Sequence, residues 1–547
     1  MSTQAQSQTT SLSVSQWLWL LLVLGVSTFF QLGAVPLFDL DEGAFAEATR
    51  EMLASGDYIS TWLNGEPRFD KPVLIHWLQA ASLTLFGQNE WAVRLPSALA
   101  GATTLLVLFV FMRRHRDAQT ALLVVAMTGL SLNIALIFKA ATADALLILF
   151  LTSTLLGIYE YFVRPRTSVL VGIYALMGLG LLTKGPVAVF FPVLISFIFF
   201  GWNRRWQDWW RAIFFLPGWG VMLAIALPWY LLQYQQMGQA FIDGFFFQHN
   251  LSRFDSAMEE HEGSVFYYLP VLLLSFVPFW ALIKPAWEAR GKGQPASLSQ
   301  YALIWLLTVV IFFSLSGTKL PHYINYGLPG LMIWLSLFHT ALSDSRWHLW
   351  PSWLMLGFLW GLPNLLVAMS GQVEHIYYQS VLAEFDQTAH EIHWYAWMSG
   401  ITVLLLWIQI SRLNNVQRLI GSAVLVMLAF LVLVSPVTAQ LQQGPIKQAA
   451  LTAKALDKPA VLWRFNRPSF SFYVDAITPK RKPQPGELAL MQTTKRERID
   501  FPYRVHYQQR QVMLIERLSE ESQHEKDIVG RSTPTSEQPP GQKNQNQ

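Results

Sequence analysis

The sequence predicts an all-α polytopic membrane protein with a small α/β domain outside the membrane near the C-terminus. Hydrophobic residues make up 52% of the 547 residues and charged residues only 14%, whereas a soluble globular chain carries about 25% charged residues. Aromatic residues reach 14% and include 23 Trp, which is typical of a protein with many membrane interfaces to anchor. Long apolar segments recur up to residue 437, and a more polar composition follows.

Net charge and cysteine content exclude several classes of function. The formal charge of +4 is too small to indicate nucleic-acid binding, and basic cytoplasmic loops explain it. The chain has no cysteine, so a disulfide, a thiol nucleophile and a thiolate metal site are all excluded. Any bound metal ion would need histidine and carboxylate ligands.

Residues 17–437 are predicted to form a membrane domain of about thirteen helices, because a spanning helix needs about 20 largely apolar residues. The polar residues 1–16 precede the first span, and no cleavage signature follows it, so it is expected to be a retained anchor. The predicted spans are Trp17–Pro36, Ala92–Met112, Thr120–Phe138, Ala145–Phe162, Val169–Leu182, Val187–Phe200, Ala212–Leu232, Val265–Ile283, Ala302–Leu315, Tyr323–Leu342, Leu349–Met369, Tyr395–Ile410 and Ile420–Pro436.

Basic residues occupy alternate connections between these spans. They include the segments MRRHR, VRPR and NRRWQDWWR, whereas the other connections are mixed or acidic. Positively charged loops face the cytoplasm, so residues 1–16 are predicted to be cytoplasmic. The connection 37–91 and the C-terminal segment are then predicted to face outward.

The C-terminal segment has two parts. Residues 438–518 contain short alternating runs such as AVLWRF and QVMLIERL between turn residues, a pattern that predicts a small α/β domain. Residues 519–547 are polar and almost free of apolar side chains, and are expected to be disordered.

Acidic and aromatic residues gather in the outward segment Phe38–Trp77. Asp39, Asp41 and Glu42 lie where the first span leaves the membrane, and Lys71 follows later among aromatic residues. One interpretation is an interfacial helix from Glu42 to Ala54 with Asp41 as its N-cap. The other is a transfer site, because carboxylates at a lipid interface cost free energy unless they are solvated, paired or used in function.

Several motifs extend beyond this segment. They are DEGAFAEATREMLASGDYISTWLNGEPRFDKPVLIHWL in the outer connection, NEWAVRLPSALAG at 89–101, LTKGPVAVFFP at 182–192, PWY at 228–230, HNLSRF at 249–254, HEGSVFYYLPVLLLSFVPF at 261–279 and FFSLSGTKLPHYINYGLPGL at 312–331. With these motifs the chain resembles the polyprenyl-phosphate-sugar glycosyltransferases of the aminoarabinose-transferase and protein O-mannosyltransferase superfamily, which have the GT-C fold.

This resemblance implies a reaction at the outer face of a bacterial inner membrane. A sugar would move from a polyprenyl (undecaprenyl) phosphate to lipid A, to another envelope glycan or to a protein. Asp41 matches the catalytic-loop acid, with Glu42 beside it, and would orient the acceptor or accept its proton. Lys71 matches the basic residue that stabilises the departing phosphate, because fixed cations stabilise the negative charge that develops there.

The resemblance also suggests further ligands. Lys184, Arg253 and Lys319 are cations on the same predicted face and would share the donor phosphate or anchor lipid headgroups. Some relatives bind a divalent metal ion through a carboxylate at the position of Asp70 and a histidine of the long outer loop. That histidine would be His249, with His261 as the rival.

The chain departs from the family pattern at Ala44-Phe45, where lipid A transferases carry Arg-Tyr, and FEKP is here FDKP. These differences leave the sugar and the acceptor open. The alternatives are a protein O-glycosyltransferase, an O-antigen-type polymerase or ligase, and a lipid-linked sugar transporter or flippase. The nearly uncharged span centres speak against transport.

Overall fold

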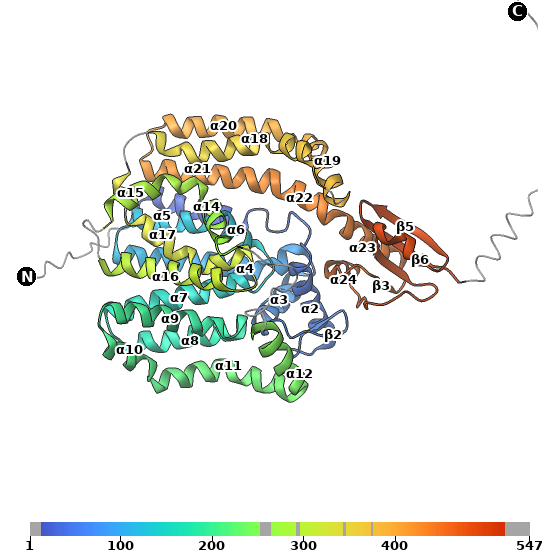
Figure 1. Cartoon of the computed structure of the whole chain (residues 1–547), viewed down its shortest axis with the longest axis horizontal. Coiled ribbons are helices and arrows are strands. Elements are labelled where there is room, and N and C mark those ends of the chain that lie inside the picture. Colours follow the sequence, from blue (N-terminus) through green and yellow to red (C-terminus); the bar gives the residue numbers. More distant parts are fainter. Residues whose placement is uncertain (1–11, 252–263, 291–295, 343–345, 374–375, 520–547) are drawn as a thin grey trace, which may run out of the picture. The chain divides into compact units, whose positions relative to one another are not determined.

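The computed structural model describes residues 12–251, 264–290, 296–342, 346–373 and 376–519. The chain divides into two compact units, Met1–Gly444 and Pro445–Gln547. The first is helical apart from a two-stranded hairpin, and the second contains a four-stranded sheet (Figure 1). This arrangement confirms the predicted fold class. The predicted tail lies almost wholly outside the described residues.

Seven helices in the described part of the chain are long and apolar enough to cross a membrane, or up to nine if each of two bent pairs is one span. The seven are Glu90–His115 (α4), Asp144–Val163 (α7), Thr167–Lys184 (α8), Leu216–Met237 (α11), Ser297–Leu315 (in α16), Trp347–Ser370 (η6 and α18) and Asn415–Gln442 (α21, η7 and α22). The bent pairs are Ala118–Gly129 with Leu132–Lys139 (α5, α6), and Tyr268–Ser275 with Val277–Ala289 (α14, η3 and α15). The predicted count of about thirteen is not confirmed.

Four shorter apolar helices account for part of the difference. They are Val14–Phe29 (α1 and η1), Leu74–Phe86 (α3), Val187–Trp202 (α9) and Trp394–Ile410 (α20). The remaining helices are Trp206–Ile213 (α10), Gln239–Phe241 (α12), Ile242–Leu251 (η2) and Ile376–Glu391 (α19). A 13-residue helix such as α3 is about 20 Å long, shorter than the roughly 30 Å hydrocarbon core.

The predicted span Tyr323–Leu342 is broken in the structure. Its residues form the 3₁₀ turn Pro321–Tyr326 (η4), the nine-residue helix Leu328–Ser336 (α17) and the turn His339–Ala341 (η5). Pro321 and Pro329 stand at the starts of η4 and α17, where the absence of an N–H group is tolerated. The break leaves the side chains of η4 available to a polar site.

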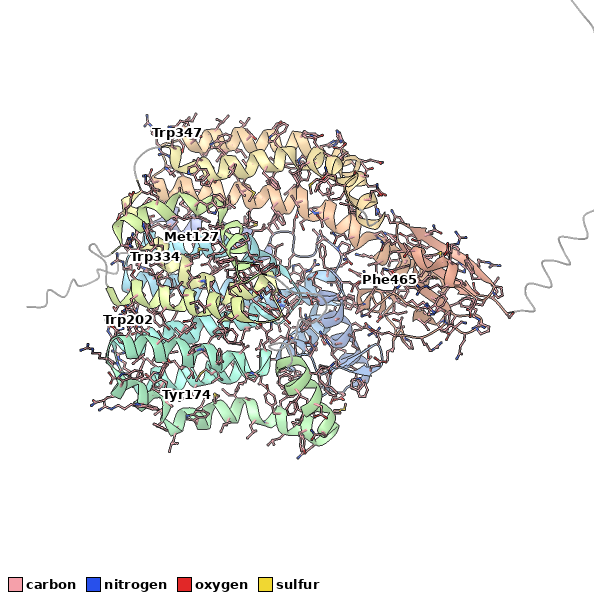
Figure 2. All side chains as sticks on the ribbon, in the orientation of Figure 1. Met127, Tyr174, Trp202, Trp334, Trp347 and Phe465 are labelled. Atoms are coloured by element: carbon pink, nitrogen blue, oxygen red, sulfur yellow. The ribbon has the colours of Figure 1, made fainter. Side chains whose placement is uncertain are left out.

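Exposed tryptophans mark one end of the helical unit. Trp202 at the end of α9 is 72% exposed and Trp347 in Arg346–Leu349 (η6) is 80% exposed. Figure 2 shows both at the left-hand end of the helices. Aromatic side chains at helix ends are typical of membrane–water interfaces.

The outer segment folds into Asp41–Ser55 (α2), the hairpin strands Trp62–Leu63 (β1) and Glu66–Pro67 (β2), and α3. Asp41 is the first residue of α2 and the N-cap is Leu40, whose side chain makes no capping bond. The predicted N-cap role of Asp41 is therefore wrong. Gly56 ends the helix in the left-handed conformation, with φ of 73°.

The second unit is a mixed sheet with two cores. Its strands are Ala460–Leu462 (β3), Leu488–Gln492 (β4), Tyr503–Gln509 (β5) and Val512–Arg517 (β6), in the order β3-β4-β6-β5. Its helices are Gly444–Leu456 (α23), Pro468–Val474 (α24) and the 3₁₀ helix Thr493–Arg498 (η8). One core contains Ile446, Phe470 and Leu490, and the other contains Trp463, Phe501 and Met513.

The turn between α8 and α9 confirms the predicted break at LTKGP. Gly185 has φ of 76°, and a Cβ atom there would lie 2.8 Å from Cζ of Phe245. A side chain is therefore excluded both by the backbone conformation and by the neighbouring ring.

We expect Gly185→Ala to destabilise the protein by about 1–3 kcal/mol, measured as thermal unfolding of the purified protein in detergent. Gly172→Ala is the matched control, because Gly172 lies within α8 and a Cβ there meets nothing within 4 Å. It should be neutral or slightly stabilising. Equal melting temperatures for the two variants would contradict the constraint at Gly185.

Candidate functional site

The first turn of α2 opens onto a cavity of about 380 Å³. Its walls are largely apolar and come from the loop after η1, α4, α6, the start of α7, η4, Phe430–Val434 (η7) and Ser435–Gln442 (α22). Its polar lining includes Asp39, Asp41, Glu42, Arg94, Lys139, Asp144 and His322. Asp41 is exposed. A few polar groups in an apolar cavity are typical of a ligand site.

Glu42 is held in place by four hydrogen bonds. Arg94 donates from Nε to Oε1 at 2.8 Å and from Nη2 to Oε2 at 2.7 Å, and the backbone N–H groups of Phe38 and Ala141 donate to the same two oxygens at 2.9 and 2.8 Å. The guanidinium also donates to the carbonyls of Leu32, Val35 and Pro36. Glu42 and Arg94 are 4% and 3% exposed. This buried pair therefore fixes the start of α2 against α4 and the 140s loop.

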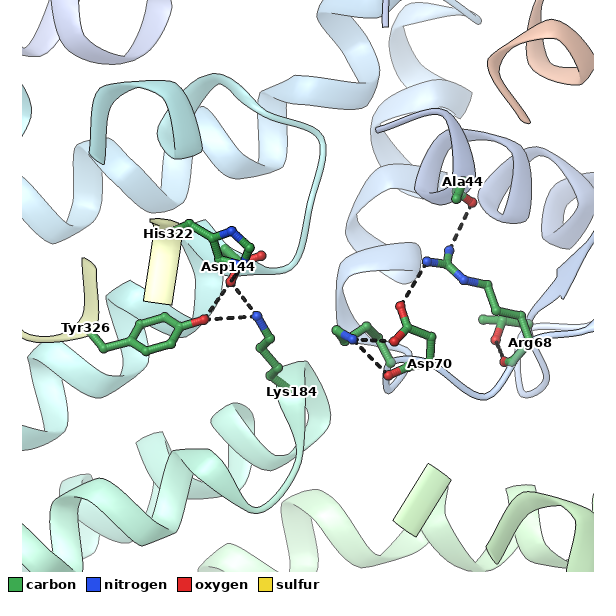
Figure 3. Close-up of polar contacts among 9 residues, drawn as sticks. Ala44, Arg68, Asp70, Asp144, Lys184, His322 and Tyr326 are labelled. Carbon is green, nitrogen blue, oxygen red and sulfur yellow. Dashed lines mark hydrogen bonds and ion pairs between the residues drawn. The ribbon is translucent and has the colours of Figure 1, made fainter. Parts of the chain in front are cut away.

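A second polar cluster joins α7, α8 and η4 (Figure 3). Lys184 Nζ lies 2.5 Å from Oδ1 of Asp144, and the hydroxyl of Tyr326 donates to the same oxygen at 2.6 Å. Lys184 also donates to the Tyr326 hydroxyl at 2.9 Å. His322 Nε2 lies 4.0 Å from the carboxylate. The acid and the lysine neutralise each other at the edge of the cavity.

A third cluster surrounds Asp70 (Figure 3). Lys71 Nζ lies 2.5 Å from Oδ1 of Asp70 and Arg68 Nη2 lies 3.2 Å from Oδ2. Lys71 also donates to the backbone carbonyl of Asp70 at 3.1 Å. The three side chains are 12–22% exposed, so one carboxylate stands between two cations with a net positive charge.

The Ala44-Phe45 dipeptide supports this third cluster. Arg68 donates to the carbonyl of Ala44 at 3.0 Å, and its guanidinium lies 4.6 Å from the centroid of the Phe45 ring. The ring in turn stacks on His76 with centroids 5.4 Å apart. Burial, with a smaller contribution from the Arg68 charge, lowers the pKa of His76 to about 3, so the imidazole is neutral. The stack therefore adds no further charge beside Arg68.

His322 lies beside the second cluster and lines the cavity. Burial lowers the pKa of His322, and the Asp144 carboxylate opposes this shift. The charges of Lys184, Asp41 and Lys71 also act on the ring. The fold thus brings Asp41 and Lys71 within electrostatic reach of one histidine, although Lys71 does not line the cavity.

The other predicted residues are more scattered. Lys184 is paired with Asp144, and Lys319 is buried and donates to the carbonyl of Ser316 at 2.9 Å. Arg253 and His261 lie outside the described residues, as does the side chain of His249. Among the side chains that the structure describes, no group of three or more His, Asp or Glu residues could hold a metal ion.

Sequence reasoning missed the roles of Arg94, His322 and Tyr326. Arg94 is a charge inside an apolar helix, which is costly unless an acid pairs with it, and this was a usable signal. His322 and Tyr326 lie within the quoted motif TKLPHYINY. The prediction of one continuous span from Tyr323 hid their part in the site.

Comparisons with known proteins agree with this architecture. A family model described as dolichyl-phosphate-mannose-protein mannosyltransferase matches residues 70–231. An undecaprenyl phosphate-alpha-4-amino-4-deoxy-L-arabinose arabinosyl transferase of Shewanella sediminis is 34% identical over 301 residues, which are 54% of each chain. The chain thus spans about half of that relative. A similarly named transferase of Pseudomonas fluorescens Pf-5 is 28% identical over 491 residues, 83% of this chain and 84% of the relative.

A solved structure resembles the whole fold. The crystal structure of ArnT from Cupriavidus metallidurans bound to undecaprenyl phosphate has a TM-score of 0.76 and 24% identity, and the match covers 92% of this chain and 98% of that one. The fold class is therefore that of the GT-C membrane proteins. The sequence matches make the chain similar to polyprenyl-phosphate-sugar glycosyltransferases of the aminoarabinose-transferase and protein O-mannosyltransferase superfamily.

We expect Arg94→Gln to destabilise the protein by about 3–5 kcal/mol, because it leaves the Glu42 carboxylate buried without its cation. The measurement is thermal unfolding in detergent. In the double variant Glu42→Gln/Arg94→Gln no buried charge remains, so part of the loss should be recovered. The single variant Glu42→Gln is measured as well. A loss of stability in the double variant equal to the sum of the losses in the two single variants would argue against the pair.

Proposed function

We propose that this protein is an integral membrane glycosyltransferase of a bacterial inner membrane that transfers a sugar from a polyprenyl phosphate to an acceptor. The observation that carries the proposal is the apolar cavity whose polar lining includes Asp41, Asp144 and His322. The names of the matched relatives, which describe undecaprenyl-phosphate-dependent sugar transfer, support the donor class.

Asp41 is assigned to the acceptor. It is exposed in the cavity at the first residue of α2, and the neighbouring Glu42–Arg94 pair fixes its backbone. The acceptor oxygen bonds to the anomeric carbon while the bond from that carbon to the donor phosphate oxygen breaks. If the acceptor is a hydroxyl, its proton passes to Asp41, and if it is an ionised phosphate, Asp41 only orients it. Glu42, whose oxygens are occupied, acts as a positioning residue.

Lys71 is assigned to the departing phosphate. Its ammonium group is held by Asp70 on one side and has three donors, so the group can contact a phosphate while it stays oriented. Arg68, on the other side of Asp70, adds positive charge. Fixed cations in a partly dehydrated site stabilise the charge that develops on the leaving oxygen. Lys184 is neutralised by Asp144, and we propose that it mainly maintains the structure of the site. Lys319 and Arg253 are further candidates for binding the donor phosphate.

The acceptor and the orientation are also proposed. We place the N-terminus in the cytoplasm and the cavity at the outer face, in accord with the basic connections. Lipid A or another phosphorylated envelope glycolipid is the favoured acceptor, on the strength of the matched aminoarabinose transferases. A protein acceptor is the second candidate, because the matching family model describes protein mannosyltransferases. Mass spectrometry of lipid A, envelope glycolipids and secreted proteins from a deletion strain distinguishes the two.

We expect Asp41→Asn and Lys71→Gln each to lower the rate of transfer at least 100-fold without a change in thermal unfolding. The assay uses purified protein, undecaprenyl-phosphate-linked aminoarabinose and lipid A. Glu66→Gln is the matched control, because Glu66 is an exposed acid of the same segment in the hairpin and should have no effect. Normal turnover by Asp41→Asn would remove its assigned role.

A divalent ion at Asp70 is the remaining cofactor question. The two carboxylate oxygens contact Arg68 and Lys71, and these cations compete electrostatically with a metal ion for the same acid. The described contacts therefore fit a metal poorly, and the reaction above includes no metal step.

We accordingly expect transfer to survive dialysis against EDTA with less than a twofold change. The rate is measured before and after dialysis, and again after Zn²⁺ or Mg²⁺ is added. Loss on dialysis with recovery on readdition would instead support a metal held by Asp70 and His249. The variant Asp70→Asn, tested in parallel, should lower the rate even without metal, because Lys71 loses the carboxylate that orients it.

A further inference from the structure

The second unit carries more positive charge than the entire chain. Between Pro445 and Ser519 there are fourteen Lys and Arg residues and six Asp and Glu residues, a net charge of +8, whereas the whole chain has +4. The rest of the protein is thus net negative. A charge of this size on about 75 residues raises local potential and attracts anions.

The sheet topology gathers part of this charge at one end. Strands β3 and β4 are parallel, and Leu462 pairs with Leu490 near their C-terminal ends. At the same end Gln492 of β4 pairs with Val512 of β6, which in turn pairs with Gln509 of β5. The segments after β3 and β4 and the turn between β5 and β6 therefore lie together at this end of the sheet.

Five basic residues of the first two segments form what we call the basic edge. They are Arg464, Arg467, Lys495, Arg496 and Arg498. Arg464, Arg496 and Arg498 are exposed and the other two are half-buried. The segment after β4 also contributes two carboxylates, Glu497 and Asp500, and Asp500 pairs with Lys482.

The basic edge is held together by neutral contacts. Lys495 Nζ donates to the carbonyl of Arg464 at 2.6 Å and so joins the two segments. Arg496 donates to the hydroxyl of Tyr503 at 2.9 Å. The Arg464 guanidinium lies 5.6 Å from the centroid of the Trp463 ring. Within the described residues none of the five cations forms an ion pair, so their charge is positioned but not neutralised.

Other charges of the same unit provide an internal comparison. Away from the basic edge the cations meet acids: Lys458 pairs with Glu516, Arg481 with Glu487, Lys482 with Asp500 and Lys454 with Asp475, and His506 lies 2.7 Å from Glu516. The same small domain thus neutralises these cations and leaves those of the basic edge without an ion pair. Solubility alone does not require such an asymmetry, since the whole domain could be served by paired charges.

We propose that the basic edge binds the phosphate groups of a phosphorylated glycolipid that serves as the acceptor, an inference that rests on the proposed function. Arginine presents a planar fork that matches phosphate oxygens in two hydrogen bonds. Five cations on two joined segments exceed what one phosphodiester headgroup neutralises, and they complement a ligand with at least two phosphates. The edge contributes to acceptor capture and takes no part in bond breaking.

The test uses the full-length protein in nanodiscs of phosphatidylcholine. The probes are bisphosphorylated lipid A, the same lipid after removal of its phosphates, and phosphatidylglycerol. The edge variant is Arg464→Gln/Lys495→Gln/Arg496→Gln/Arg498→Gln. The matched control removes four exposed cations elsewhere in the unit, Lys454→Gln/Arg481→Gln/Lys482→Gln/Arg504→Gln. Arg498→Glu is a milder second variant, because Arg498 is exposed and its side chain forms no hydrogen bond or ion pair with the described residues.

We expect the edge variant to bind bisphosphorylated lipid A at least about tenfold more weakly at low salt, since each basic residue near an anionic group adds to the attraction. The control should change binding less than threefold and Arg498→Glu about fivefold. Removal of the phosphates from the lipid should abolish the difference between edge variant and wild type. In the transfer assay KM for lipid A should rise while kcat stays unchanged.

Three results would overturn the inference: equal losses in the edge and control variants, unaltered binding in the edge variant, and phosphatidylglycerol binding as tight as lipid A binding. The first would indicate a general effect of charge, and the last a site for membrane phospholipids. Binding that depends on the edge without any sugar transfer would refute the proposed reaction and leave the edge intact. Sugar transfer by the edge variant with an unchanged KM for lipid A would refute the role of the basic edge and leave the proposed reaction intact.

Discussion

The buried Glu42–Arg94 pair is the interaction on which the rest of the site depends. It connects four parts of the chain: the loop after η1, the first turn of α2, the long helix α4 and the loop before α7. An ion pair excluded from water is worth little net stability, but loss of one partner is costly. Its value here is geometric, because it fixes the backbone at residue 42 and so the place where Asp41 enters the cavity.

The other charges near the cavity follow the same physical rule. Asp144 shares its oxygen with Lys184 and Tyr326, and Asp70 stands between Arg68 and Lys71. In surroundings of low polarity an isolated charge is costly, so Asp70 and Asp144 each have a cation, and each of these cations has a fixed direction. A departing phosphate then meets donors that are already oriented, which is the arrangement that stabilises a transition state most. Asp41, which is exposed to the cavity, is the acid left to meet an acceptor.

Local patterns predicted much of this fold. The helix from DEGAFAEATREML, its end at Gly56 and the break at LTKGP follow from periodicity and glycine, and all three are present. The span count was not recovered, because hydropathy measures composition and not the straightness of a helix: α17 is nine residues long and two other apolar stretches bend by 70° and 89°. Partners such as Arg94 with Glu42, or Tyr326 with Asp144, are separated by 52 and 182 residues, and no local pattern specifies such contacts.

The two units use charge in opposite ways, and the difference follows from their surroundings. In the helical unit Glu42 pairs with Arg94 and Asp144 with Lys184, since apolar walls would penalise an isolated charge. In the second unit, water screens exposed cations and reduces their mutual repulsion, so a group such as Arg464, Arg496 and Arg498 can remain unpaired at small cost. An unpaired group keeps its full attraction for an outside anion, whereas a paired one must first lose its partner. Selective binding of a multiply charged ligand therefore belongs on the exposed sheet edge, and the chemistry belongs where the charges are held in fixed pairs.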